Sequence, residues 1–453
     1  MRATPVWIWP PNRAEPRLAA TLAVDGSLGS AGGKALGVWQ FDPAFVEANL
    51  PTPDPVMLSL SRGSKPIRFS GHDGLPGVVR DAMPQGYGAD RIVALAGRNL
   101  LPMELLEMGL PDSTGALEIC VDLDQKLRWQ PGRSEDLERL AGELEAEDPP
   151  SRAIRRLNGD VGTSQGGEKP KTTVVHRGQL WLAKMRDRGG LRELPAREFV
   201  TMTLAGQAGI RIPDIELKNA GAHQIFLIQR FDRHGDPLQP ARRMVASAHS
   251  VLDLGAAALR GDLGRSYLVL ADKLRRWAHN SPFLESDLQE LWCRMAFNAL
   301  VGNTDDHPRN HAFLFDGQAW RLSPAFDITP TLQAPKDPAV VLEPSSVVLA
   351  MDVTAGKHRT SVVTVERLLV CAPHFGLSVM AAGQWLLETA EHVSHAWETM
   401  LVAHLLDPQP AVQRQLREDC RPAFGFSQWL AQNPAKVEAM IDTLSAQMGK
   451  RRR

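Results

Sequence analysis

The feature that most constrains this chain is the stretch from Gly302 to Asp327, which combines an irregular loop with a hairpin. The loop reads Gly-Asn-Thr-Asp-Asp-His-Pro-Arg-Asn, so that Asp305 and Asn310 are separated by four residues. An apolar run, an Asp-Gly pair that would form a two-residue turn and a second apolar run predict a hairpin that returns Asp327 towards the loop. Three oxygen-bearing side chains on irregular backbone suit a hard cation that bridges phosphate groups.

The same residue types are common in ordinary turns, so this spacing by itself is a weak signal of catalysis. His307 and His311 are spaced as i and i+4, which permits a metal-ligand interpretation. Pro308 lies between them and argues against the regular helix that such a pair needs. The interpretation of the loop therefore depends on the rest of the chain.

Length and composition predict a globular protein of several domains. At 453 residues the chain exceeds one typical core, and its 43% hydrophobic and 23% charged content is that of a soluble fold. A net charge of −1 gives no overall attraction to nucleic acid or to an anionic membrane. The four cysteines include no C-x-x-C pair, which predicts reduced thiols and argues against a zinc site. We expect neither a signal peptide nor a membrane-spanning stretch, and hence a cytoplasmic protein.

The order of apolar runs predicts three parts. Residues 1–149 alternate short strands with helices, and an acidic helical stretch before Pro149-Pro150 marks the first boundary. Residues 150–244 combine a Gly-rich loop, strands and one helix, whereas the pattern of residues 245–453 is helical.

The Gly-rich loop of the second part lies between residues 160 and 168. Its backbone N–H groups and hydroxyls can wrap phosphate oxygens, although it matches neither a Walker A nor a Rossmann motif and such residues also form plain turns. The candidate phosphate contacts are Gly162, Thr163, Ser164, Gly166 and Gly167.

Strand signals follow on both sides of Arg177-Gly178 and place Lys184 on the strand after this loop. A phosphate-binding lysine has this place in protein kinases, and a solvent-facing edge lysine is the ordinary alternative. A later strand would lie along an adenine ring, with backbone groups near Gln229 and Phe231 bonding to the base. The spacing from Asp305 to Asn310 is that of a kinase catalytic loop, in which the Asp accepts a hydroxyl proton and the Asn holds magnesium.

The order of these elements resembles the HipA-type serine/threonine kinases, which are toxins of bacterial toxin–antitoxin pairs. The resemblance spans nearly the whole chain and is most specific around Asp305. The matching stretches are Leu75-Pro-Gly, Met83-Pro-Gln-Gly-Tyr-Gly, Leu105-Leu-Glu-Met-Gly, Thr114-Gly-Ala-Leu, Ser164-Gln-Gly-Gly-Glu-Lys-Pro-Lys, Leu182-Ala-Lys, Ile228-Gln-Arg-Phe-Asp-Arg, Gly302-Asn-Thr-Asp-Asp-His-Pro-Arg-Asn and Leu322-Ser-Pro-Ala-Phe-Asp.

The resemblance implies an α+β fold of the bilobal, protein-kinase-like type. It assigns residues 1–149 to an extra amino-terminal α/β subdomain, residues 150–244 to an ATP-binding subdomain, and residues 245–453 to an all-helical carboxy-terminal lobe with the catalytic loop. It implies ATP and Mg²⁺ as cofactors. The implied site consists of Asp305 as catalytic base, Asn310 and Asp327 as magnesium ligands, Lys184 and residues 162–167 on the ATP phosphates, and Gln229 with Phe231 at the adenine.

The implied activity is transfer of the ATP γ-phosphate to a protein, in known cases an aminoacyl-tRNA synthetase. Family members also phosphorylate a serine at or just before the Gly-rich loop, where this chain offers Thr163 and Ser164. The implied partner is a HipB-like helix-turn-helix antitoxin that binds operator DNA, so any DNA contact would be indirect, and no membrane is implied.

Two alternatives remain open. One is a pseudokinase or co-repressor that acts only by binding the antitoxin. The other is a metal-dependent phosphohydrolase that uses Asp305, Asp306, His307 and His311.

Overall fold

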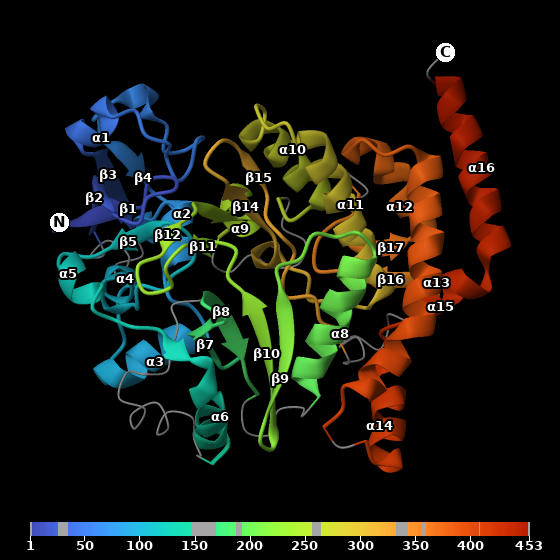
Figure 1. Cartoon of the computed structure of the whole chain (residues 1–453). Coiled ribbons are helices and arrows are strands. Elements are labelled where there is room, and N and C mark those ends of the chain that lie inside the picture. Colours follow the sequence, from blue (N-terminus) through green and yellow to red (C-terminus); the bar gives the residue numbers. More distant parts are fainter. Residues whose placement is uncertain are drawn as a thin grey trace. The chain divides into compact units, whose positions relative to one another are not determined.

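The computed structural model describes residues 2–25, 35–146, 169–186, 193–255, 264–331, 343–354, 359–406 and 408–451 (Figure 1). The chain divides into two compact units. Unit 1 comprises Met1–Pro195, Asp214–Ala257 and Ala312–Trp320, and unit 2 comprises Ala196–Pro213, Ala258–His311 and Arg321–Arg453. The predicted boundary near residue 149 lies outside the described residues, and the one at residue 244 falls inside unit 1. The three-part division stays a prediction.

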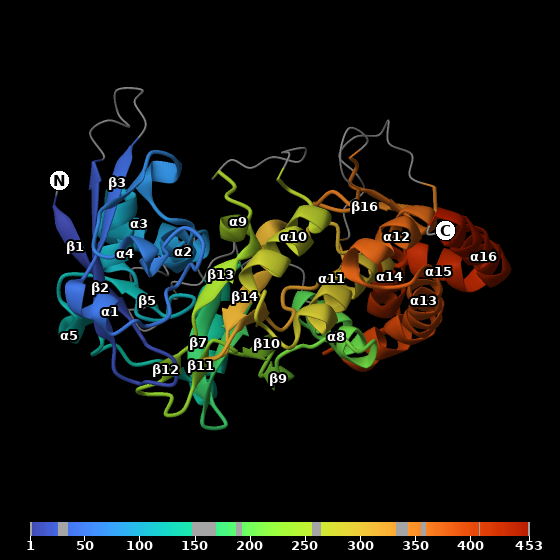
Figure 2. The same ribbon diagram turned by 90° about the horizontal axis from the view of Figure 1, so that it is seen from above.

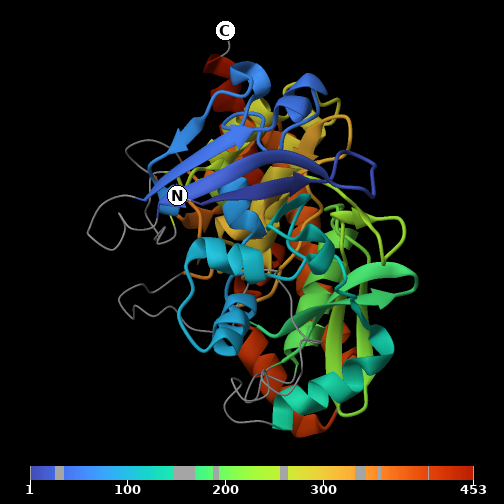
Figure 3. The same cartoon turned by 90° about the vertical axis from the view of Figure 1, so that its left-hand side faces the viewer.

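The first sheet of unit 1 is antiparallel, with the strand order β4-β3-β2-β1-β5, and Figure 3 shows its long strands side by side in dark blue. Buried and accessible residues alternate along β1, as expected for a strand with one face in the core. The strands are β1 (Ala3–Ile8), β2 (Arg17–Asp25), β3 (Leu36–Phe41), β4 (Ile67–Phe69) and β5 (Leu117–Ile119). The accompanying helices are α1 (Pro43–Glu47), α2 (Gly77–Ala82), α3 (Tyr87–Ala96), α4 (Pro102–Met108) and α5 (Leu123–Lys126).

The second sheet of unit 1 has the order β6-β7-β8-β10-β9 and carries the predicted Lys184. Arg177 and Gly178 both have positive φ, so they form the predicted tight turn between β7 and β8. Helix α6 (Leu137–Ala146) buries Leu137 and Leu140 in one core cluster with strand residues such as Trp181, so it is a packed helix. The strands are β6 (Gly132–Arg133), β7 (Lys171–His176), β8 (Gln179–Lys184), β9 (Ile215–Ala220) and β10 (His223–Gln229).

The predicted hairpin before Asp327 is present as β14 (Ala312–Phe315) and β15 (Trp320–Leu322), next to β13 (Val245–Ser247). The two central residues of its turn are Gly317 and Gln318, one residue later than the predicted Asp316-Gly317 pair. Asp316 is the residue before the turn, and its backbone and side chain bond across it. The backbone N of Asp316 donates to the carbonyl of Ala319 at 3.2 Å, and its Oδ1 accepts from the backbone N of Gln318 at 2.9 Å. Unit 1 also contains β11 (Arg233–His234), β12 (Ala241–Arg242) and α9 (Ala248–Val251).

Unit 2 is mainly helical, and Figure 2 shows α13, α15 and α16 lying together. Its helix α11 leads into the Asp305 loop, and most of its residues are buried, which explains the apolar pattern of that segment. A two-stranded ribbon of β16 (Ser346–Val348) and β17 (Val362–Thr364) departs from the all-helical lobe that was predicted. The helices are α8 (Leu194–Gln207, which starts in unit 1), α10 (Tyr267–Trp277), α11 (Leu284–Leu300), α12 (Val365–Cys371), α13 (Val379–Ala403), α14 (Pro410–Cys420), α15 (Gly425–Gln432) and α16 (Pro434–Arg451).

All four cysteines are described, and each is a free thiol. Burial raises the pKa of Cys371 to about 12 and that of Cys120 to about 11. Within the described ranges, no helix is long and apolar enough to cross a membrane.

Candidate active site

The loop that carries Asp305 begins where helix α11 ends, and a glycine makes the turn possible. Gly302 has φ = +63°, and a Cβ there would lie 2.3 Å from the carbonyl oxygen of Ala423. A larger residue would therefore meet both backbone strain and a steric clash. Asn303 then closes the turn, because its backbone N donates to the Asn298 carbonyl at 2.8 Å and its Nδ2 donates to Asn298 Oδ1 at 2.9 Å.

Within this loop the structure brings Asp305 and Asn310 together. Asn310 is buried, and its Nδ2 donates to the carbonyl oxygen of Asp305 at 3.2 Å. The backbone N of His307 donates to the same carbonyl at 2.7 Å, and Pro308–Asn310 form a short 3₁₀ turn. With Nδ2 used inside the loop, Oδ1 of Asn310 is the atom that can bind a hard cation. Asp305 itself is exposed.

Asp327 follows the hairpin and is the third oxygen-bearing residue of the expected site. It is exposed and has φ = +61°, a left-handed conformation that Asp tolerates better than most residues and that often occurs at functional sites. Beyond it, the backbone N of Thr331 donates to the Gly302 carbonyl at 2.9 Å, and Thr331 Oγ1 accepts from the backbone N of Thr304 at 3.2 Å. The segment after Asp327 thus runs beside the start of the Asp305 loop, within unit 2.

A cluster of charged residues fixes the segment that leads to Asp327. Arg211 contacts Asp287 at 2.6 Å and Glu290 at 2.5 Å, and Asp287 Oδ2 accepts from the backbone N of Leu322 at 2.9 Å. The backbone N of Ala325 donates to the carbonyl of Arg211 at 2.7 Å. Burial raises the pKa of Asp287, and the nearby Arg211 guanidinium opposes that effect. The cluster ties both ends of the segment to helix α11 and to Arg211.

The donor set of Asn310 and Asp327 fits Mg²⁺, since an amide oxygen and a carboxylate oxygen are hard ligands. Mg²⁺ commonly binds through one or two protein groups together with substrate phosphates and water. Asp306 and His311 are instead buried and face each other, with 2.9 Å between Asp306 Oδ2 and His311 Nε2. Among the described residues, no group of three or more His, Cys, Asp and Glu side chains could hold a metal. The four residues of the phosphohydrolase alternative, Asp305, Asp306, His307 and His311, accordingly do not form such a group.

On the second sheet of unit 1, Lys184 lies in a row with a second lysine. Lys171 on β7 and Phe226 on β10 are both register partners of Lys184, so the three side chains share one face of the sheet. The Lys184 ammonium lies 5.8 Å from the centre of the Phe226 ring, and Lys171 is buried. Like charges directly opposite each other are destabilising, so an anion such as phosphate suits this place. The sequence analysis missed Lys171, although a Lys-Pro-Lys run directly before a strand was a usable signal.

Gln229 lies on the other face of this sheet. Its register partner is Trp181, which belongs to the core cluster under helix α6, whereas Lys184 is three residues further along β8 and faces the opposite side. Gln229 and Trp181 help to line a pocket of about 430 Å³. The backbone N of Gln229 already donates to the carbonyl of Asp214 at 2.8 Å, so its backbone carbonyl is the group that could serve a nucleotide bound beside Lys184.

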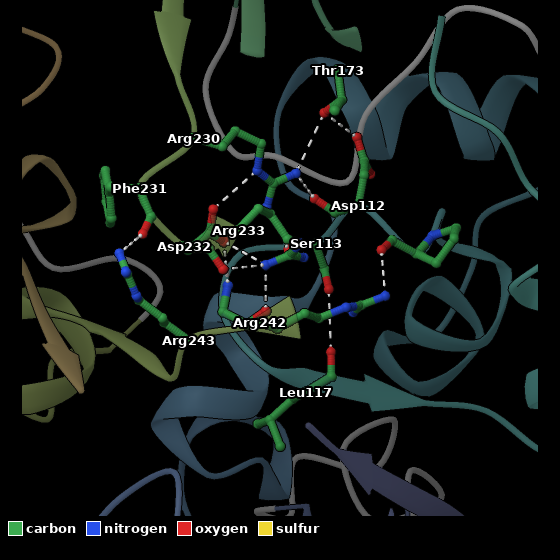
Figure 4. A network of polar contacts seen from close by, with 12 residues as sticks. Asp112, Ser113, Leu117, Thr173, Arg230, Phe231, Asp232, Arg233, Arg242 and Arg243 are labelled. Carbon is green, nitrogen blue, oxygen red and sulfur yellow. Dashed lines mark hydrogen bonds and ion pairs between the residues drawn. The ribbon is translucent and has the colours of Figure 1, made fainter. Parts of the chain in front are cut away.

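The segment after Gln229 is held by a buried network of charged groups, which Figure 4 shows. Asp232 accepts hydrogen bonds from Arg230 at 2.8 and 3.0 Å, from Arg233 at 2.8 Å and from the backbone N of Gly115 at 2.9 Å. The two guanidinium groups also donate to the carbonyl of Ser113, at 3.0 and 2.6 Å. Sequence reasoning gave no sign of these long-range contacts.

Phe231 lies at the edge of this network. Its carbonyl oxygen accepts a hydrogen bond from Arg243 at 3.0 Å, as Figure 4 shows, so one backbone group near the expected adenine site is already engaged. The remaining expected contacts, Gly162, Thr163, Ser164, Gly166 and Gly167, lie outside the described residues.

Comparison with known proteins gives a family and a fold. The family described as HipA-like C-terminal domain matches residues 163–397, which is more than half of the chain. A curated protein of Sinorhizobium fredii named "Putative kinase Y4mE" is 26% identical over 142 residues. That match covers 30% of this chain and 33% of that protein, so it spans about a third of the relative's length.

A solved structure from Shewanella oneidensis MR-1, described as the toxin–antitoxin system HipA, HipB and its operator DNA complex, has a chain of the same fold. The TM-score is 0.64 at 17% sequence identity, and the alignment covers 94% of this chain and 97% of that one. At this identity the similarity shows the fold alone. The prediction of an α+β, protein-kinase-like fold of the HipA type is thereby confirmed.

Proposed function

Because this chain belongs to the HipA-like C-terminal domain family, we propose that it is an ATP-dependent serine/threonine protein kinase and the toxin of a toxin–antitoxin pair. The observation that carries the proposal is the Asp305 loop, in which Asn310 is bonded to the Asp305 backbone while the segment after Asp327 runs beside the loop's start. Phosphoryl transfer in protein kinases uses an Asp and an Asn in one loop and a later carboxylate. Asp305, Asn310 and Asp327 have that order and those residue types.

Phosphoryl transfer needs positioning and charge neutralisation more than covalent chemistry. In the proposed reaction, Asp305 orients a serine or threonine hydroxyl and accepts its proton as the oxygen bonds to the γ-phosphorus of ATP. The bond from that phosphorus to the β–γ bridging oxygen breaks, and ADP leaves. Asn310 Oδ1 and the Asp327 carboxylate would hold Mg²⁺, which neutralises negative charge on the phosphates when bound. Lys184 and Lys171 would bind phosphate oxygens from the sheet, together with the loop of residues 162–167.

The proposal includes autophosphorylation at Ser164 or Thr163, since both follow the predicted start of the Gly-rich loop. It also includes a protein substrate, for which an aminoacyl-tRNA synthetase is the family precedent. The partner we propose is a HipB-like helix-turn-helix antitoxin, because the Shewanella structure of the same fold is a complex with HipB and operator DNA. Contact with DNA would then pass through the antitoxin.

The test is to incubate the purified protein with labelled ATP and Mg²⁺ and to locate phosphate by peptide mass spectrometry. Wild type is compared with Asp305→Asn and with Asp442→Asn, a control that makes the same change at an exposed residue of α16. We expect phosphate on Ser164 or Thr163 in wild type and in the control, and none in Asp305→Asn. Transfer by folded Asp305→Asn protein at the wild-type rate would overturn the role of this residue.

Two further outcomes would replace the proposal. Magnesium-dependent binding of ATP without any transfer, to itself or to proteins of a lysate, would identify a protein that acts by binding alone. Release of inorganic phosphate without a phosphorylated acceptor would identify a phosphohydrolase.

A further inference from the structure

Three polar side chains are buried together behind the Asp305 loop. Asp306 and His311 are each 2% exposed, and Tyr267 is 0% exposed. The Tyr267 hydroxyl and His311 Nε2 both meet Oδ2 of Asp306, the latter at 2.9 Å. The Tyr267 and His311 rings are in edge-to-face contact at 5.6 Å. We call these three residues the Asp306 cluster.

The Asp306 cluster joins the two ends of the loop. Asp306 follows Asp305 directly, and His311 follows Asn310 directly. The hydrogen bond between Asp306 and His311 therefore connects the neighbour of the proposed base, Asp305, with the neighbour of the proposed metal ligand, Asn310. An irregular loop lacks the backbone ladder that fixes a strand, so side-chain bonds of this kind decide where such residues lie.

Tyr267 gives the cluster a fixed point outside the loop. It is the first residue of α10, whose N-cap Ser266 accepts from the backbone N of Leu268 at 3.2 Å. The backbone N of Tyr267 donates to the carbonyl of Asp352 at 3.1 Å, and Ser266 and Asp352 form a parallel bridge. The backbone of Tyr267 is thus anchored to α10 and to the segment at Asp352, both in unit 2, and this places the side chain whose hydroxyl bonds to Asp306.

We propose that Asp306, His311 and Tyr267 are positioning residues, which hold Asp305 and Asn310 at the separation that phosphoryl transfer needs. The inference rests on the proposed function. Oδ2 of Asp306 accepts two hydrogen bonds in a buried place where water does not compete, so the loop has one favoured arrangement. Loss of either donor leaves part of the carboxylate unsatisfied and lets the loop shift. A misplacement of about 1 Å in such a site costs roughly 100-fold in rate.

The test compares three variants of the full chain. Tyr267→Phe removes one donor, His311→Leu removes the other, and His311→Gln keeps a donor at the distance of Nε2. The control is Tyr87→Phe, because Tyr87 is the other tyrosine of the chain and its buried hydroxyl has no partner among the described residues. The measurements are kcat and KM for ATP, the melting temperature, and hydrogen exchange of peptides from residues 300–315.

We expect Tyr267→Phe and His311→Leu to lower kcat by about 10- to 100-fold, with KM for ATP within about twofold of wild type. Exchange in residues 300–315 should rise in these two variants, and His311→Gln should recover most of kcat. Tyr87→Phe should change neither kcat nor the exchange in residues 300–315. A purely structural role would lower the melting temperature but leave kcat of the folded protein unchanged.

Two results would overturn the positioning role. One is a kcat within about twofold of wild type in folded Tyr267→Phe and His311→Leu. The other is unchanged exchange in residues 300–315, whatever the activity. Wild-type protein that transfers no phosphate would refute the proposed function, and the exchange measurement would still decide whether the cluster holds the loop.

Discussion

Replacing Asp232 by Asn should strongly destabilise unit 1. Its carboxylate is buried and accepts from Arg230, from Arg233 and from the backbone N of Gly115, all within 3.0 Å. Asn preserves the size of the side chain but removes the negative charge and places an NH₂ group among donors. The two buried guanidinium groups then lose the carboxylate that lies between them.

The magnitude follows from the cost of uncompensated buried charge. Breaking a buried ion pair by removing one partner costs about 3–5 kcal/mol. For a unit of about 250 residues, each kcal/mol shifts the melting temperature by about 2–4 °C, which gives a loss of about 6–20 °C. The control is Glu143→Gln, the same chemical change in a pair with Arg139 at 2.9 Å, whose side chains are 60% (Arg139) and 39% (Glu143) exposed. That pair should contribute no more than about 0.5 kcal/mol.

The effect should also depend on pH in a defined direction. Burial acts to raise the pKa of Asp232, but the guanidinium groups of Arg230 and Arg233 outweigh it and hold the pKa below its ordinary value of 3.8. A carboxyl with a lowered pKa contributes stability that is complete above the ordinary value and is lost as the pH falls below it. The difference in melting temperature between wild type and Asp232→Asn should therefore be constant from about pH 6 to 8 and narrow only below about pH 4.

Scanning calorimetry of the three proteins across this pH range is the assay, with urea unfolding as a second measure of stability. A loss for Asp232→Asn that is no larger than the loss for Glu143→Gln would refute the argument. So would a difference that already narrows between about pH 8 and pH 6, since the ionised form of Asp232 should persist there.

Three further predictions follow from the second sheet of unit 1 and from the start of the Asp305 loop. Lys171→Ala and Lys184→Ala should each weaken binding of MgATP by roughly 10- to 100-fold in titration calorimetry, the range for hydrogen bonds to charged groups. Gln229→Ala should change that affinity by less than about twofold, because its side chain lies on the other face of the sheet from Lys184. Gly302→Ala should lower the melting temperature far more than Gly209→Ala, since both have positive φ but a Cβ meets backbone atoms only at Gly302.

The parts of this protein that sequence predicts well are those set by neighbours in the chain. The turn at Arg177-Gly178 and the hairpin before Asp327 follow from residue types at a few adjacent positions. The spacing of Asp305 and Asn310 likewise becomes a contact within one short loop. Even in this hairpin the centre of the turn lies one residue later than predicted. The Asp316 side chain bonds to the backbone N–H groups of Gln318 and Ala319, and the Asp-Gly pair alone does not indicate these bonds.

The parts that sequence could not predict depend on partners far away in the chain. Asp232 bonds to Gly115 across 117 positions, and Tyr267 meets Asp306 across 39. A local pattern carries no information about which distant donor a buried carboxylate will find. The face on which Gln229 lies was within reach, however, since alternation along β8 and β10 sets it once the pairing is known.

The two groups of proposed site residues are fixed by different means, and this difference predicts how substitutions act. Lys171 and Lys184 lie on paired strands, where backbone hydrogen bonds set their positions whatever the neighbouring side chains are. Asp305 and Asn310 lie on irregular backbone, whose position depends on buried polar side chains such as the Asp306 cluster. A substitution in the sheet core next to Lys171 and Lys184 should therefore lower the stability of the protein before it lowers the rate of phosphate transfer. A substitution behind the loop should change the rate in protein that is still folded, because the loop loses its one favoured arrangement before the unit loses its core.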